Sequence, residues 1–83
     1  MQDDVNVYKS LDLMLPAQVP RELSESALRA GEPESAISGL LDEAFGVGAL
    51  TQEVIDFVES VYSDGPVIEM LEALKQLQRD SAA

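Results

Sequence analysis

The chain has 83 residues, with no cysteine and no histidine, and its sixteen acidic side chains against five basic ones give a formal net charge of −11. The missing residue types exclude disulfides, thiolate metal sites, cysteine nucleophiles and histidine general bases. The negative charge disfavours binding to nucleic acid and anionic lipid and attracts basic surfaces. Hydrophobic residues make up 46% of the chain, and we expect residues 1–83 to form a single acidic helical domain.

The N-terminal residues are polar and acidic, and we expect residues 1–6 to form a flexible tail. They lack the Lys or Arg and the apolar run of a secretory signal. No apolar run in the chain approaches the ~18 residues that cross a membrane. These features predict a soluble cytoplasmic protein without membrane contact.

A short alternating pattern follows the predicted tail. Leu11, Leu13 and Leu15 alternate with Asp12 and Met14 and are followed by a proline. A period of two is typical of a strand, so residues 7–15 suit a short strand. The same residues could equally form an extended arm that lies on the domain, and the choice between a paired strand and an arm stays open.

Four amphipathic helices are predicted after this segment. Pro33 and Pro66 suit the first turn of a helix, Thr51 is a good N-cap, and Gly31 is a natural end. The predicted fold class is therefore mainly α, a small four-helix domain with a short N-terminal extended segment or strand. The predicted helix ranges are about 20–30, 33–45, 51–62 and 66–80, and residues 81–83 are expected to fray.

The apolar stripes of these helices predict the core. Leu23, Ala27 and Ala30 form the thin stripe of the first helix. Tyr8 and Tyr62 are expected to be partly exposed, because each carries a polar hydroxyl. A groove for a partner helix is the alternative to core for some of the larger apolar residues, among them Phe57, Tyr62, Met70 and Leu74.

The acids form a long stretch without compensating bases. From Ala30 to Leu74 there are ten acids and no Lys or Arg. Helical spacing places these acids opposite the apolar stripes, where like charges a turn apart repel by about 0.3–0.5 kcal/mol per pair. A basic partner would relieve that repulsion, whereas the alternative is a solvated face that keeps the protein soluble. The predicted partner-binding residues are Glu34, Asp42, Glu43, Glu53, Asp56 and Glu59.

The segment LDLMLPAQVPRELSESALRAGEPESAISGLLDEAF, residues 11–45, resembles a ribbon-helix-helix domain, the fold of many repressors and antitoxins. The resemblance implies a strand with the three alternating leucines inward, two helices joined at Gly31, and a dimer. It also implies that Ser10, Asp12 and Met14 would face a DNA groove. As an antitoxin, such a protein would instead hold a toxin through its C-terminal helices.

The function predicted from these features is that of a non-enzymatic protein that binds and neutralises or positions a basic protein, as antitoxins, immunity proteins and inhibitors do. No residue pattern suggests a catalytic site, a metal site or a cofactor. One alternative is a dimeric ribbon-helix-helix DNA-binding regulator. Another is a structural subunit of a larger assembly, and homodimer formation stays open.

Overall fold

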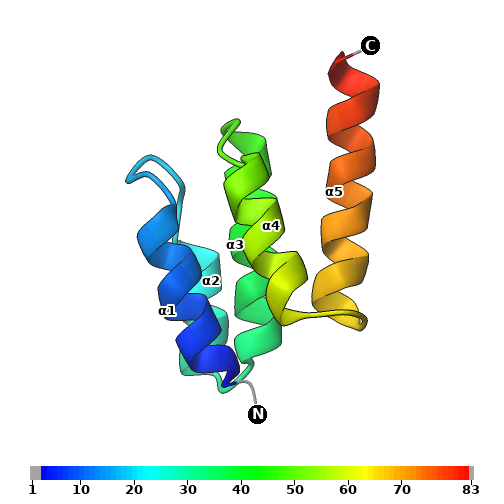
Figure 1. Ribbon diagram of the computed structural model, residues 1–83. Coiled ribbons are helices and arrows are strands. Elements are labelled where there is room, and N and C mark those ends of the chain that lie inside the picture. The colour runs from blue at the N-terminus through cyan, green and yellow to red at the C-terminus, as the bar shows by residue number, and fades with distance from the viewer. Residues whose placement is uncertain (1–2, 83) are drawn as a thin grey trace.

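Five helices make up the fold in the computed structural model, which describes residues 3–82. Figure 1 shows them, and within the described range the chain forms no strand, so the protein is a small all-α domain. The mainly-α prediction is confirmed, and each of the four predicted helices is present to within two residues at each end. In chain order the helices are α1 (Asp4–Met14), α2 (Glu22–Arg29), α3 (Pro33–Gly46), α4 (Gln52–Val61) and α5 (Pro66–Ala82).

The predicted N-terminal strand is wrong, because this segment forms helix α1. The Asp3 side chain caps the helix by accepting a hydrogen bond from the Val5 backbone N–H at 3.0 Å. Leu15 is extended, as expected for a residue before proline, and ends the helix. The buried residues Val7, Tyr8 and Leu11 follow a helical spacing that the alternating leucines obscured.

The ribbon-helix-helix resemblance fails for the same reason. That fold requires a strand, and the part of the chain that would supply it is helical. Leu11 and Leu15 are buried, but Leu13, which a strand would turn inward with them, is 86% exposed. A DNA-binding ribbon is therefore excluded for this segment.

The ends of the chain also differ from the prediction. Asp4, Val5 and Asn6 belong to the first turn of α1 rather than to a flexible tail, while residues 1–2 lie outside the described range. At the other end, α5 continues to Ala82, and residue 83 is not described. Among residues 3–82, no helix combines the length and the apolar character that crossing a bilayer requires.

Helix α3 is the centre of the fold. It packs against α1, α2 and α5, and Figure 1 shows it between α2 and α5 with α4 in front. Gly31, with φ of 78°, ends α2 and turns the chain into α3, as predicted. Five residues of α3 have no exposed surface: Ala36, Ile37, Leu40, Leu41 and Ala44.

Helix α2 buries a face that differs from the predicted stripe. Leu23 is 71% exposed, whereas Ser24 is 1% exposed. Ser24 lies against Tyr8 of α1, whose hydroxyl is 2.9 Å from the Ser24 Oγ. Tyr8 was expected to be partly exposed but is buried, because this hydrogen bond satisfies its hydroxyl inside the fold. Tyr62 is half-buried, as predicted.

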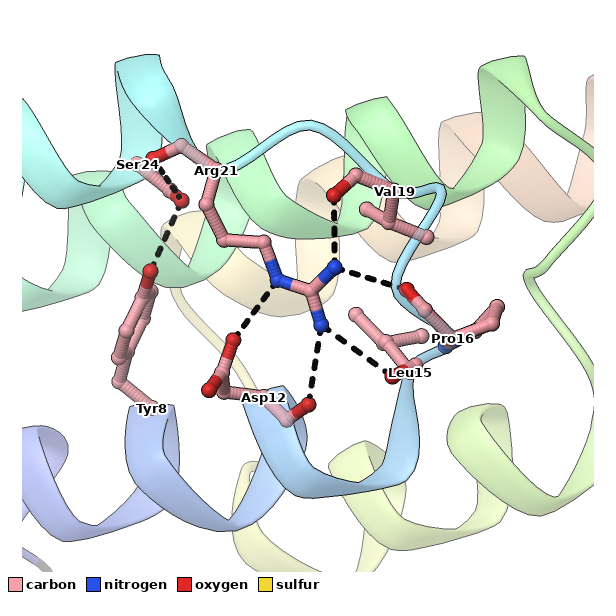
Figure 2. A network of polar contacts seen from close by, with 7 residues as sticks. All are labelled: Tyr8, Asp12, Leu15, Pro16, Val19, Arg21 and Ser24. Carbon is pink, nitrogen blue, oxygen red and sulfur yellow. Dashed lines mark hydrogen bonds and ion pairs between the residues drawn. The ribbon is translucent and has the colours of Figure 1, made fainter.

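Arg21 holds the connection between α1 and α2 (Figure 2). Its Nε donates to the Asp12 Oδ1 at 2.8 Å. Its two terminal nitrogens donate to the backbone carbonyls of Asp12 and Leu15, at the end of α1, and of Pro16 and Val19 in the loop, over 2.6–3.2 Å. One guanidinium thus donates to four carbonyl groups at the helix end and in the turn. The Asp12 and Pro16 carbonyls also accept from the backbone N–H groups of Leu15 and Val19.

Candidate interaction surface

The three predicted acids of α3 project from the central helix. Glu34 and Asp42 are exposed, and Glu43 is half-buried. None of the three forms an ion pair with a residue between 3 and 82. Within residues 3–82 their carboxylates are thus left without a basic partner, as a binding face requires.

The three predicted acids of α4 lie on its exposed side, opposite the buried Val54 and Val58. Their surroundings differ. The Asp56 carboxylate accepts a hydrogen bond from the Gln52 side chain at 2.8 Å. The Glu59 carboxylate is already paired with Lys75 of α5 at 2.8 Å, so its charge is compensated within the chain.

Lys75 compensates two carboxylates at once. It lies 2.8 Å from Glu59 and 3.6 Å from Glu72. The hydrogen bond to Glu59, together with the charges of both carboxylates, raises the pKa of Lys75 above its ordinary value of 10.5. The surface between α4 and α5 is therefore less negative than the sequence suggested.

Three of the sixteen acids take part in ion pairs within the described residues: Asp12, Glu59 and Glu72. The bases involved are Arg21 and Lys75. The other thirteen acids have no ion-pair partner in that range. The surplus of negative charge therefore remains on the surface of the fold.

A small acidic cleft adjoins Glu34. It measures about 270 Å³ and is lined by Asp4, Gly31, Glu32, Pro33, Glu34 and Ser35. The Tyr62 hydroxyl donates to the Asp4 Oδ1 at 2.6 Å. Burial raises the pKa of Tyr62 well above its ordinary value of 10.0, and the hydrogen bond to Asp4 and the charges of Asp4 and Glu34 raise it further. The sequence did not place Asp4 here, because it was assigned to a tail.

A second cleft, of about 340 Å³, lies between α1 and α4. It is lined by Asp3, Asn6, Val7, Ser10, Phe57, Ser60 and Val61. Its apolar residues come from both helices, and Phe57 and Val61 also pack against the core. No sequence pattern identified this cleft, because the residues that form its α1 wall were assigned to a tail (residues 1–6) and to a strand or arm (residues 7–15).

A third cleft, of about 320 Å³, lies on the other side of α4. It is lined by Gln52, Ile55, Lys75, Gln78 and Arg79. The Gln78 side chain donates to the Leu50 carbonyl at 2.9 Å and ties α5 to the start of α4. This cleft contains two bases and no acid among its lining residues, so it differs in charge from the other two.

The six predicted acids differ in their surroundings. Glu34 lies by the first cleft, Asp56 accepts from Gln52 of its own helix, and Glu59 is paired with Lys75 of α5. In residues 3–82 there is no group of three or more acidic side chains close enough to hold a metal ion. No protein-family model, curated protein or solved structure matches the chain.

Proposed function

We propose that this protein is a non-enzymatic interaction protein that binds and neutralises or positions a basic protein partner, as an antitoxin, immunity protein or inhibitor does. The observation that carries the proposal is that three of sixteen acids are paired within the described residues. Unpaired surface carboxylates attract a basic partner, speed its association and disfavour nucleic acid. Lys and Arg side chains of the partner would also relieve the repulsion among these carboxylates.

The partner would be a cytoplasmic protein with a positively charged binding surface. A chain without cysteine needs no oxidising compartment for its fold, which suits the cytoplasm. Because isolated exposed ion pairs contribute only about 0–1 kcal/mol each, the complex also needs apolar contacts at its centre. The negative surface supplies steering and selectivity, and the apolar contacts supply most of the affinity.

A structural subunit of a larger assembly is the second candidate. It is favoured by two leucines that lie on the surface, Leu13 at 86% and Leu23 at 71% exposure. In that case the apolar residues would bind another subunit or a second copy of the chain. Size-exclusion chromatography with light scattering at micromolar concentration separates the two candidates, because a monomer argues against the second.

The proposal is tested by affinity capture from cells of the source organism at low and at high ionic strength. We expect a specifically retained protein with a high isoelectric point, whose recovery falls as salt screens the charges. The matched control is a variant of the same chain that carries four substitutions: Asp42→Asn, Glu43→Gln, Glu53→Gln and Asp56→Asn. It should retain less of that protein. A retained partner that is acidic, or one held equally at both salt concentrations, would count against the proposal.

A further inference from the structure

We propose that the basic partner docks in the cleft between α1 and α4, and that it presents there a basic segment with an apolar side chain at its centre. This inference rests on the proposed function and names the site at which it operates. It moves the binding surface from the acids of α3 and α4 together to the side of α4 that faces α1. The apolar residues that line this cleft select the apolar side chain of the partner, and the acids near it select the basic residues.

The floor of the cleft is apolar. Val7 of α1 and Phe57 and Val61 of α4 line it together with small polar residues. Its volume of about 340 Å³ is near the lower end of the range for ligand pockets, which suits one or two apolar side chains rather than a cofactor. An inserted apolar side chain would therefore contact side chains of both helices.

Leu13 extends the α1 wall of the cleft. Asn6 and Ser10 line the cleft, and Leu13 follows them at the i, i+4, i+7 spacing of one helix face. Leu13 is 86% exposed, the highest value among the large hydrophobic residues that lie on the surface. A partner that covers this face would bury an apolar side chain that the chain itself leaves in water.

One acid lines the same cleft and two more lie near it on α4. Asp3 lines it, and Glu53 and Asp56 lie one helical turn before the lining residues Phe57 and Ser60. Figure 1 shows that helices α1 and α4 run antiparallel. In agreement, the Tyr62 hydroxyl at the end of α4 donates to Asp4 at the start of α1. Because the two helices run in opposite directions, Glu53 and Asp56 lie toward the end of the cleft where Leu13 follows Ser10.

The charge around this cleft selects a basic occupant. Asp3, Glu53 and Asp56 carry three negative charges without an ion-pair partner in the described residues, and Lys9 is the nearest base in the sequence. On the opposite side of α4, Lys75 neutralises Glu59, and the cleft there contains two bases. The charge on the α5 side of α4 is therefore largely compensated, whereas the α1 side combines acids that have no ion-pair partner in the described residues with an apolar floor.

The experiment uses the full chain and a displayed library of random peptides as the probe. We expect the selected peptides to combine Lys or Arg with a large apolar residue. Nuclear magnetic resonance of the labelled protein with a selected peptide should shift the backbone amides of Asn6, Ser10, Leu13 and Phe57. Recovery of no peptide above the bead background would overturn the inference, as would shifts confined to α2 or α5.

Matched variants separate the cleft from the rest of the surface. Leu13→Ser should weaken binding of a selected peptide by about tenfold, because it removes an apolar contact at the centre of the interface. Glu53→Gln should weaken it by about two- to fivefold and reduce its salt dependence. The controls, Leu23→Ser and Glu25→Gln, change the same residue types on the exposed side of α2 and should leave affinity within twofold.

The outcomes distinguish this inference from the proposed function. If basic peptides bind but Leu13→Ser and Leu23→Ser weaken their binding equally, the cleft is not the docking site. The proposal of a basic partner would then still stand. Selected peptides without Lys or Arg would contradict both. Circular dichroism of each variant shows whether the fold is retained, and Leu13 and Glu53 are exposed enough for that to be expected.

Discussion

A single side chain can determine how two helices are joined, and Arg21 does so here. It is one of five bases in a chain with sixteen acids, yet its side chain is turned inward to Asp12 and to the loop. The planar guanidinium has enough donors to serve one carboxylate and four carbonyl groups in fixed geometry. Nothing in the sequence distinguishes Arg21 from a surface base, because four of its five acceptors are backbone carbonyl groups.

Replacing Arg21 by Ala should lower the free energy of unfolding by about 2–3 kcal/mol, because several carbonyl groups lose a charged donor. Arg21→Lys should recover less than half of the loss, since a single ammonium cannot reproduce the fork. Arg29→Ala is the control, because Arg29 is an exposed base at the end of the helix that follows Arg21, and it should cost about 0.5 kcal/mol or less. Urea denaturation measures all three, and equal losses for the two Ala variants would contradict the role of Arg21.

At the scale of elements, the main lesson comes from α1. Leu11, Leu13 and Leu15 have the period of a strand, but Val7, Tyr8 and Leu11 have the period of a helix, and both patterns occupy the same few residues. Asp3 as the N-cap and Pro16 after the last turn favour the helix. The helix also places Tyr8 against Ser24 of α2, a pairing that a strand in this position would not make.

The helix and the strand predict different costs for neighbouring leucines. Leu11→Ala should lower the free energy of unfolding by about 2–4 kcal/mol, because Leu11 is fully buried. Leu13→Ala should change it by about 0.5 kcal/mol or less, because Leu13 is on the surface. A ribbon strand would make the two losses similar. Chemical denaturation of both variants therefore checks the helix directly.

The contact between Tyr62 and Asp4, which joins α4 to α1, makes stability depend on alkaline pH. The folded chain raises the pKa of Tyr62 above its ordinary value of 10.0, so the folded state holds the hydroxyl proton more tightly than the unfolded state. The contribution is complete below pH 10 and is lost as pH rises above it. Urea denaturation from about pH 8 to 11 should show a steeper loss in the wild type than in Tyr62→Phe. Parallel pH profiles would contradict the assignment.

At the scale of the whole molecule, net charge opposes the fold that carries it. Thirteen acids without ion-pair partners in residues 3–82 repel one another across a small domain. A net charge of this size favours solubility but destabilises a compact state through self-repulsion. The same charge that would recruit a basic partner therefore leaves the free protein less stable than its core would allow.

Screening should accordingly stabilise the protein. Raising sodium chloride from about 10 mM to about 0.5 M should increase the melting temperature by about 5 °C, which corresponds to roughly 1 kcal/mol in a domain of this size. Chloride is preferred to sulfate, which stabilises proteins by exclusion from their surface. The double variant Asp42→Asn, Asp80→Asn should show a smaller increase. A melting temperature that falls with salt would indicate that internal ion pairs outweigh the repulsion.

The amino-acid sequence alone predicts the class of fold, the four helices from α2 to α5 and the outward position of most acids. These features depend on caps, turn residues and apolar spacing, which act within a few residues. The tertiary structure decided the rest: that the first segment is helical, that Tyr8 and Ser24 meet in the core, and that Glu59 is neutralised by Lys75. The cleft between α1 and α4 is also a feature that only the tertiary structure creates. The local pattern of the first segment fits a helix and a strand alike, and the contacts between helices depend on side chains that are far apart in the sequence.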